Sequence, residues 1–298
     1  MVENQLIKLT EQFLVEIGSV KRYSENTLQS YKRDLDQFNN FLIEKNITSV
    51  GQITEKTIKH YLIYLNELEL SKSSISRKLS SLRSLFNYII TQEDEADNPA
   101  KKVKNPKFNR KLPETITLDS FNKIYTLIDE EESKYRAILN KAIFEVLYGC
   151  SLRVSELCGL QFNDVNLNNN SVRVLGKGSK YRIVPIGNKS IQILQEYIQL
   201  RKKTTGKDPF FIKENGTGID RWFVYKLVKK YLSKVTDISK RSPHILRHSS
   251  ATHMLNEGAD LMAVKEILGH ENLSTTQIYT HVSIENLKKS YKSAHPKS

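Results

Sequence analysis

Two stretches in the second half of the chain place basic side chains where an anionic group could bind. In GCSLRVSEL (149–157), a glycine break precedes Arg153 at a predicted helix start. There the guanidinium and the backbone N–H groups of the first turn can face one anion together. In GKGSKYR (176–182), Lys177 occupies a glycine-containing turn between two short alternating runs. Both stretches therefore favour binding of an anion.

Two further stretches add histidines, an arginine and a tyrosine. The run HILRHSSATH (244–253) follows a proline and is predicted to be helical, so that His244, Arg247 and His248 share one face. Downstream, LGH ends at His270 and STTQIYTH (274–281) contains Tyr279. Single side chains of these types are more often ion-pair partners or packed groups than catalytic residues. The order of the whole set is therefore a more specific signal of function than any one of them.

Two other classes of site fit these stretches less well. The phosphate loop of nucleotide-hydrolysing enzymes needs G-x-x-x-x-G-K-[ST] between a strand and a helix, and residues 176–179 have neither that spacing nor that context. His244 and His248 have the spacing of a metal pair, but Arg247 lies between them and no third ligand is obvious. The sequence also lacks a carboxylate cluster suited to two metal ions. We therefore expect no metal and no cofactor.

The charge of the chain indicates a polyanionic partner. The 298 residues carry 46 Lys and Arg against 33 Asp and Glu, a formal net charge of +13. The excess is spread over the chain, with 18 − 14 = +4 in residues 1–112 and 28 − 19 = +9 in residues 113–298. A folded protein that is positive in both parts suits nucleic acid, although charge alone also fits a merely solubilised surface.

The first ninety residues are predicted to be helical throughout. Residues 4–18 and 24–44 space their apolar side chains by three and four, and further helices start at Thr54 and Ser71. Ser24, Thr54 and Ser71 are the residue types that cap helix N-termini. No strand pattern interrupts these segments, so they predict one small helical domain.

The remainder of the chain is predicted to be mostly helical with one hairpin. Residues 94–113 break every periodicity, contain three prolines and switch from acidic to basic, which is typical of a linker. Helices follow at about 118–130 and 134–148, and resume from about 188 to the C-terminus. Between them, residues 171–175 and 181–186 alternate in polarity and are joined by the glycine-containing turn, which predicts a β-hairpin.

Taken together, the order Arg, Lys, His-x-x-Arg, His, Tyr over about 127 residues resembles the tyrosine recombinase (phage integrase) family, and within it the Xer-type recombinases. The stretches LRVSEL, GKGSKYR, HILRHSSATH and LGHENLSTTQIYTH carry the resemblance, which covers nearly the whole chain. It implies a mainly α protein with a helical core-binding domain (1–93), a linker (94–113) and a mixed α/β catalytic domain (114–298). The catalytic domain would be mostly helical with a small antiparallel sheet, and the two domains would form a clamp around DNA.

The resemblance also implies a metal-independent mechanism and a set of catalytic residues. Tyr279 would attack the scissile phosphate and form a 3′-phosphotyrosine intermediate on the way to a Holliday junction. Arg153 and Arg247 would bracket the phosphate, and His270 would donate a further hydrogen bond to it. The implied catalytic residues are Arg153, Lys177, His244, Arg247, His270 and Tyr279.

The remaining implied roles are supporting ones. His244 would assist proton transfer at the tyrosine, and Lys177 would protonate the leaving 5′-oxygen. Glu156 would support the arginine loop from behind. Basic side chains on the fourth helix and the hairpin are our candidates for DNA-backbone contacts. These candidates are Lys72, Arg77, Arg83, Lys180 and Arg182.

The expected partner is double-stranded DNA that carries a specific recombination site. A helix at about 284–293 would dock on the neighbouring protomer and couple a homo- or hetero-tetramer, the alternative being that it packs on its own domain. A second recombinase and a septal DNA translocase are further partners that the resemblance allows. Cys150 and Cys158 are too few for a secreted scaffold, and the N-terminus lacks a signal-peptide pattern, so we expect a cytoplasmic protein.

Within this family the duty most expected is Xer-type resolution of chromosome or plasmid dimers. A mobile-element integrase or excisionase is the alternative, and a type IB topoisomerase shares the same residue types. A catalytically silent DNA-binding protein on the same scaffold is the alternative from another class, and the complete set of six residues argues against it.

Overall fold

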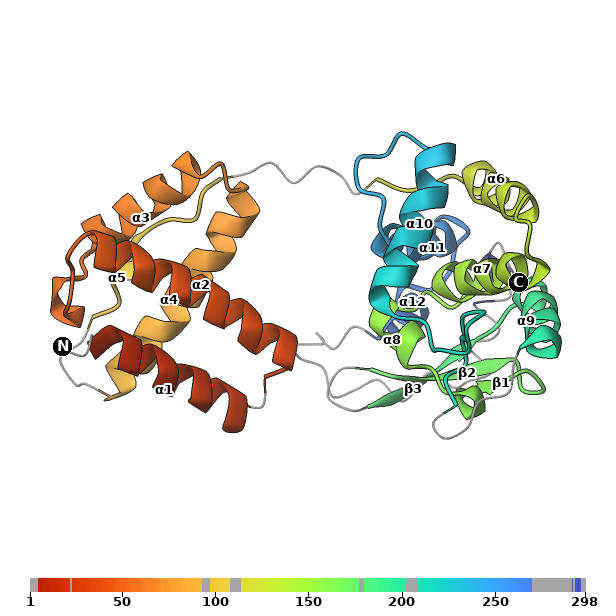
Figure 1. Cartoon of the computed structure of the whole chain (residues 1–298), viewed down its shortest axis with the longest axis horizontal. Helices are drawn as coiled ribbons and strands as arrows, with labels where there is room; N and C mark the ends of the chain where they lie inside the picture. The colour runs from red at the N-terminus through yellow and green to blue at the C-terminus, as the bar shows by residue number, and fades with distance from the viewer. Residues whose placement is uncertain are drawn as a thin grey trace. The chain divides into compact units, whose positions relative to one another are not determined.

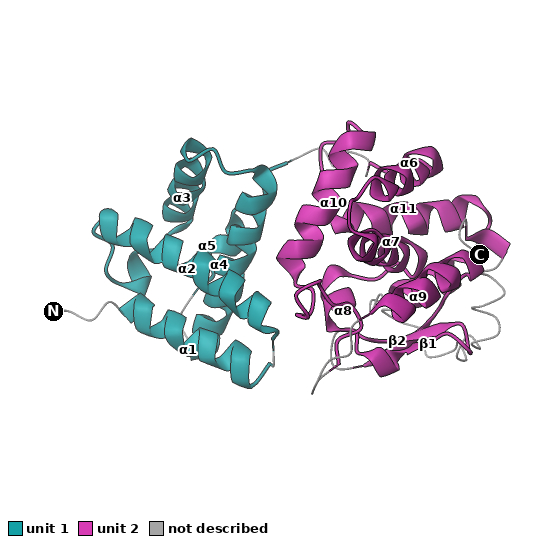
Figure 2. Cartoon of the chain, turned by 45° about the vertical axis from the view of Figure 1, so that its right-hand side comes forward, with its two compact units in different colours: residues 1–111 teal, residues 112–298 magenta. Residues whose placement is uncertain are grey.

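The computed structural model describes residues 5–21, 23–92, 97–107, 114–176, 180–201, 208–269, 291 and 293–295. The chain divides into two units, residues 1–111 and 112–298, which are shown in different colours in Figure 2. Each unit has its own hydrophobic core.

The first unit is built from amphipathic helices that begin at capped residues. Ser24 and Thr54 each accept a hydrogen bond from the backbone N–H three residues on, at 3.3 and 3.4 Å, and Ser71 does the same for Ser74 at 3.2 Å. The three helix starts predicted from these caps are therefore confirmed. The elements are α1 (Gln5–Ser19), α2 (Glu25–Glu44), the 3-10 turn η1 (Val50–Gln52), α3 (Glu55–Glu67), α4 (Lys72–Gln92) and α5 (Pro99–Lys102).

The segment around α5 differs from the linker that its composition suggested. Ala100 and Val103 are buried in the core of the first unit, at 0% and 4% exposure. Arg83 on α4 donates hydrogen bonds to the carbonyl oxygens of both residues, at 3.0 and 2.6 Å. A segment this short has too few apolar residues to show a period, so only its contacts with α3 and α4 reveal that it belongs to the first unit.

The second unit packs helices against a small sheet (Figure 1). Buried side chains of α7, α10 and α11 contribute to its core, and α12 packs against α11 and β3. The described helices are α6 (Leu118–Asp129), α7 (Lys134–Gly149), α8 (Val154–Gly159), the 3-10 turn η2 (Phe162–Asp164), α9 (Asn188–Leu200), α10 (Arg221–Val235), α11 (Pro243–Asn256) and α12 (Leu261–Leu268). The strands are β1 (Val165–Asn166), β2 (Ser171–Leu175) and β3 (Tyr181–Pro185).

The sheet is antiparallel in the order β1–β2–β3, and β2 with β3 forms the predicted hairpin. Val172 pairs with Val184, and Val174 pairs with Arg182. Because paired residues and alternate residues of a strand share a face, Arg182 lies on the same face as these three buried valines. The register therefore turns this arginine toward the interior of the unit.

Candidate active site

Arg153 is the N-cap of α8, at the helix start that the sequence predicted. Its backbone N–H donates to Glu156 Oε2 at 2.8 Å, and its Nη1 donates to Glu156 Oε1 at 2.7 Å. The anion that this N–H faces is therefore a carboxylate of the protein itself. The guanidinium remains about one-third exposed, so it can still reach a group outside the fold.

Arg247 enters the same cluster from α11, with only 8% of its side chain exposed. Its Nη1 donates to the carbonyl oxygen of Ser151 at 2.6 Å, and its Nη2 donates to the carbonyl oxygen of Leu268. Ser151 has a left-handed backbone (φ 51°), and its hydroxyl lies 2.7 Å from that of Ser250 on α11. A non-glycine residue adopts this conformation only where its surroundings hold it, and these two contacts do so.

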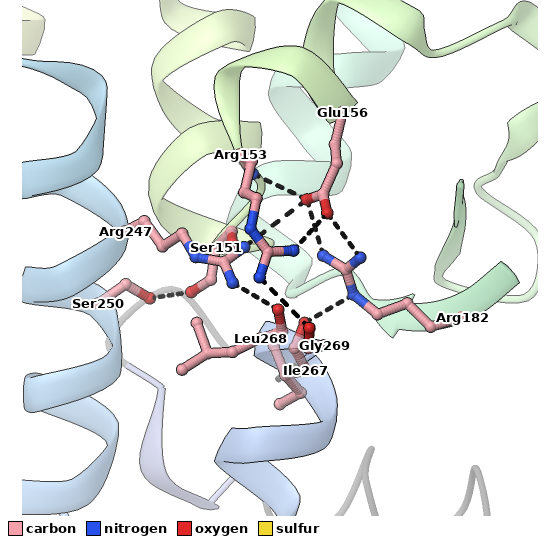
Figure 3. Close-up of polar contacts among 9 residues, drawn as sticks. All are labelled: Ser151, Arg153, Glu156, Arg182, Arg247, Ser250, Ile267, Leu268 and Gly269. Carbon is pink, nitrogen blue, oxygen red and sulfur yellow. Dashed lines mark hydrogen bonds and ion pairs between the residues drawn. The ribbon is translucent and has the colours of Figure 1, made fainter. Parts of the chain in front are cut away.

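Glu156 lies at the centre of the cluster and binds three arginines (Figure 3). Arg182 forms a two-pronged contact with it, from Nη1 to Oε1 at 2.9 Å and from Nη2 to Oε2 at 2.8 Å. Arg247 Nη1 lies 3.6 Å from Oε2. The supporting role that the sequence assigned to Glu156 thus has a geometric basis, because one buried carboxylate orients guanidiniums from α8, β3 and α11.

The C-terminal end of α12 supplies the second set of acceptors. Arg182 Nε donates to the carbonyl oxygen of Ile267 at 2.9 Å, Arg247 Nη2 to that of Leu268, and Arg153 Nη2 to that of Gly269 at 3.3 Å. The last carbonyls of a helix lack partners within the helix and carry partial negative charge. Sequence analysis missed this contact, because nothing in residues 267–269 indicates which side chains cap them.

The electrostatics of the cluster favour a bound anion. Three guanidiniums and one carboxylate leave two positive charges in excess. Burial, together with the charge of Arg153, lowers the pKa of Arg247 to about 10, so this residue stays protonated at neutral pH. Burial acts to raise the pKa of Glu156, but the hydrogen bonds from Arg182 and Arg153 outweigh it and lower that pKa, so the carboxylate stays ionised.

Comparison with known proteins identifies the family. Residues 114–286 match the model of the phage integrase family, and residues 10–93 match the phage integrase N-terminal SAM-like domain. The chain belongs to this family. It is 37% identical to tyrosine recombinase XerC of Halalkalibacterium halodurans, over 96% of each chain. It is 36% identical to tyrosine recombinase XerD of Staphylococcus saprophyticus, over 97% of this chain and 99% of the other.

Solved structures agree with this assignment. XerH bound to a palindromic difH substrate superposes with a TM-score of 0.70 and 25% identity, over 94% of this chain and 83% of that chain. The Tn1549 transposon integrase in complex with circular intermediate DNA has the same TM-score at 22% identity, over 94% and 98% of the two chains, and shares the fold. The chain is therefore an Xer-type site-specific recombinase, an enzyme that transfers DNA strands through a tyrosine, and the mainly α fold with one small sheet is confirmed.

The structure describes half of the residues expected to be catalytic in this recombinase. Arg153 and Arg247 meet in the cluster, whereas His244 is exposed in the first turn of α11. Lys177, His270 and Tyr279 lie outside the described residues. The expected helix at 284–293 also lies mostly outside them.

At the C-terminus, the described residues pack on their own catalytic unit. The Tyr291 hydroxyl donates to the carbonyl oxygen of Gly149 at 2.9 Å. His295 Nε2 lies 3.2 Å from Ser250 Oγ, and both Tyr291 and His295 are buried at 3% exposure. These contacts agree with the alternative in which the end of the chain packs on its own domain.

The candidate DNA contacts have different surroundings. Lys72 and Lys180 are exposed. Arg77 is half exposed and pairs with the buried carboxylate of Asp34 on α2. Arg83 donates hydrogen bonds to backbone carbonyl oxygens of the segment around α5. Arg182 is only 12% exposed, and protein acceptors occupy its guanidinium, so its surroundings do not match the predicted phosphate contact.

The outer face of α10 is a basic surface that sequence analysis did not single out. This helix carries one arginine and four lysines and no acidic residue. Trp222 on the same face is 67% exposed, and Lys226 Nζ lies 5.0 Å from the centre of its ring. Trp222, Lys226 and Lys229 are spaced by four and three residues, so they lie on one exposed face of the helix, while the buried apolar residues of α10 lie on the other. This spacing was the signal in the sequence that could have predicted the basic face.

The described residues contain neither a cluster of metal ligands nor a membrane-spanning helix. No three His, Cys, Asp or Glu side chains within the described ranges gather as a metal site would need. None of the described helices is both long and apolar enough to cross a membrane.

Proposed function

We propose that Arg153 and Arg247 bind the scissile phosphate of the recombination site during strand cleavage. The observation that carries this proposal is their meeting in one cluster with two excess positive charges. Attack on a phosphodiester raises its charge from one to two negative in the five-coordinate transition state. Planar guanidiniums that are fixed in advance stabilise that added charge more than the ground state, which lowers the barrier.

Tyr279 supplies the nucleophile in this proposal. A phenol has a reference pKa of about 10, so it needs help to lose its proton at neutral pH. His244 assists that proton transfer, and the product is a 3′-phosphotyrosine. The phosphate is exchanged between oxygens without loss of the bond energy, so the reverse attack by a 5′-hydroxyl rejoins the strand.

Lys177 and His270 complete the proposed site. Lys177 donates its proton to the leaving 5′-oxygen, and His270 donates a hydrogen bond to the phosphate. Gly269 precedes His270 in the chain, and its carbonyl oxygen accepts a hydrogen bond from Arg153. Gly176 and Lys180 flank residues 177–179, and the Gly176 N–H donates to the Lys180 carbonyl oxygen at 2.8 Å. These contacts support the proposal, because they anchor the chain directly beside both residues.

The proposed duty is resolution of chromosome or plasmid dimers by a tetramer on DNA, with the two units surrounding the duplex, in the cytoplasm. The near-complete match to XerC and XerD relatives favours this duty over integration of a mobile element. Exchange of the C-terminal helix between protomers would require Tyr291 and His295 to leave their contacts in their own unit. Analytical ultracentrifugation with and without DNA tests the assembly, and a 1:1 complex at saturating site DNA would contradict it.

The experiment that tests the chemistry uses a nicked duplex as a suicide substrate. Its site is selected by the chain's own binding from fragments of the host genome, and the reaction contains EDTA. We expect a slower-migrating DNA species that protease removes. Mass spectrometry of the digested adduct should find the nucleotide on the peptide that contains Tyr279.

Three outcomes would contradict the proposal. A nucleotide attached to another residue would identify that residue as the nucleophile in place of Tyr279. Intact DNA binding without any adduct would indicate a catalytically silent DNA-binding protein. Adduct formation on random supercoiled DNA, with relaxation by a monomer, would indicate a topoisomerase.

The α10 face is the second part of the proposal and contacts the DNA backbone. We expect Lys226→Ala combined with Lys229→Ala to lower the slope of log binding constant against log salt by about two, since each lost phosphate contact removes about one. Lys123→Ala on α6, an exposed lysine paired with Asp119, is the matched control and should leave the slope unchanged. An unchanged slope in the double variant would exclude this face from the interface.

A further inference from the structure

The guanidinium of Arg182 binds acceptors inside the protein. Its Nη1 and Nη2 donate hydrogen bonds to the two carboxylate oxygens of Glu156, and its Nε donates to the carbonyl oxygen of Ile267 at 2.9 Å. A lysine cannot make these three contacts at once, because an ammonium is a point charge without a planar fork. The side chain therefore connects β3, α8 and the end of α12 (Figure 3).

The two arginines proposed to bind phosphate depend on the same two anchors. Arg153 binds Glu156 and the carbonyl oxygen of Gly269, and Arg247 binds the carbonyl oxygen of Leu268 and approaches Glu156. Arg182 thus binds Glu156 and the end of α12, the same two groups that fix Arg153 and Arg247. Without its fork, only Arg153 and Arg247 themselves would connect the buried carboxylate with the end of α12.

Gly269 shows how closely Arg182 and α12 fit. This residue has a left-handed backbone (φ 61°), and a Cβ there would lie 3.1 Å from Arg182 Cδ and 3.2 Å from Nε and Cζ. Contacts of this length force the neighbour to move. Glycine at this position therefore serves both the turn and the approach of the guanidinium.

We propose that Arg182 is a positioning residue that sets the geometry of Arg153 and Arg247 by holding Glu156 and the end of α12 together, without contacting DNA. The catalytic consequence rests on the proposed function of those two arginines. Misplacement of a catalytic group by about 1 Å can slow a reaction about 100-fold. We expect a loss of this order when the fork is removed.

The test compares Arg182→Lys with Arg173→Lys. Arg173 lies on the neighbouring strand β2 and donates to Asp164 at 3.0 and 2.9 Å, but its side chain is half exposed and outside the cluster. Single-turnover adduct formation on saturating nicked duplex should slow about 100-fold in Arg182→Lys and less than twofold in Arg173→Lys. The salt slope of DNA binding is measured in Arg182→Gln, which removes the charge, with Tyr279→Phe added, and should equal that of Tyr279→Phe alone.

Hydrogen exchange of the DNA-free protein provides a readout that does not depend on catalysis. We expect Arg182→Lys to accelerate exchange in two segments that are distant in sequence, residues 150–160 and 261–269. Arg173→Lys should accelerate neither. If wild type forms no adduct while this exchange pattern holds, the proposed function fails and the positioning of the cluster by Arg182 stands.

Gly269→Ala is a second variant that disturbs the same guanidinium from the other side. Its matched control is Gly258→Ala, which has a similar backbone strain (φ 84°) but no atom within 4 Å of the added Cβ. Gly269→Ala should slow adduct formation at least tenfold more than Gly258→Ala, with an unchanged salt slope. A salt slope lowered by about one in Arg182→Gln would overturn the proposal, as would unaltered exchange or an unaltered adduct rate in Arg182→Lys.

Discussion

Tyr279→Phe is expected to bind recombination-site DNA as tightly as wild type and to form no covalent adduct. The substitution removes the oxygen that we propose bonds to phosphorus, and a ring carbon cannot replace it. Binding should persist, because the basic surfaces that contact phosphates are unchanged. Gel-shift titration measures the affinity, and denaturing electrophoresis of the nicked-duplex reaction measures the adduct.

Tyr291→Phe is the matched control for this prediction, since it removes a second tyrosine hydroxyl twelve residues away. Burial raises the pKa of Tyr291 well above its ordinary range, and its hydroxyl donates to the carbonyl oxygen of Gly149. This hydroxyl is therefore a poor nucleophile with a structural partner. Tyr291→Phe should lose some thermal stability and keep the adduct, and the reverse pattern in the two variants would refute the assignment of Tyr279.

Arg247→Ala is expected to slow adduct formation about 1,000-fold at saturating DNA. Removal of a single preorganised donor from a charged transition state typically costs 100- to 1,000-fold, and this variant also disturbs its neighbours. The carbonyl oxygens of Ser151 and Leu268 lose a donor, and Glu156 loses a nearby positive charge. Quenched-flow or manual time courses on the suicide substrate measure the rate.

Loss of a buried arginine also destabilises the fold, by about 3 kcal/mol where a buried ionic contact is broken, so a stability control is required. Arg201 is a suitable one, because it is 5% exposed and donates to the carbonyl oxygens of Pro209 and Phe210 and to Asp208. Arg201→Ala should lower the melting temperature without a 1,000-fold effect on the adduct rate of the folded fraction. Equal rate losses in both variants would show that Arg247 acts through stability alone.

Local patterns in the sequence were sufficient to predict the helices of the first unit and the hairpin of the second. Spacing by three and four gave the helices, and the caps at Ser24, Thr54 and Ser71 marked where three of them begin. The alternation in residues 171–175 and 181–186 predicted the hairpin. These features are determined by residues close together in the chain, which is why one sequence reveals them.

The order of the residues expected to be catalytic was also visible, because short stretches such as those around Arg153 and Arg247 are specific as a set. By contrast, Arg182 was expected to contact DNA phosphates, whereas in the structure protein acceptors occupy its guanidinium. Its pairing with Val174 across the sheet turns it inward, and alternation with the apolar Val184 was the available signal. Charge suggests a solvated residue, but strand register decides which face a side chain occupies.

The assembly of the cluster was decided by tertiary structure alone. Residues 156, 182, 247 and 267 are separated by 20 or more positions along the chain, and each has an ordinary surface interpretation when taken singly. Only the packing of α12 against β3 and α11 brings the end of that helix to the guanidiniums. The sequence by itself therefore determined which groups could do chemistry on a phosphate. The fold determined how far each arginine is exposed and which acceptors it binds, because a buried carboxylate and three helix-end carbonyls orient guanidiniums only where packing brings them within hydrogen-bond distance.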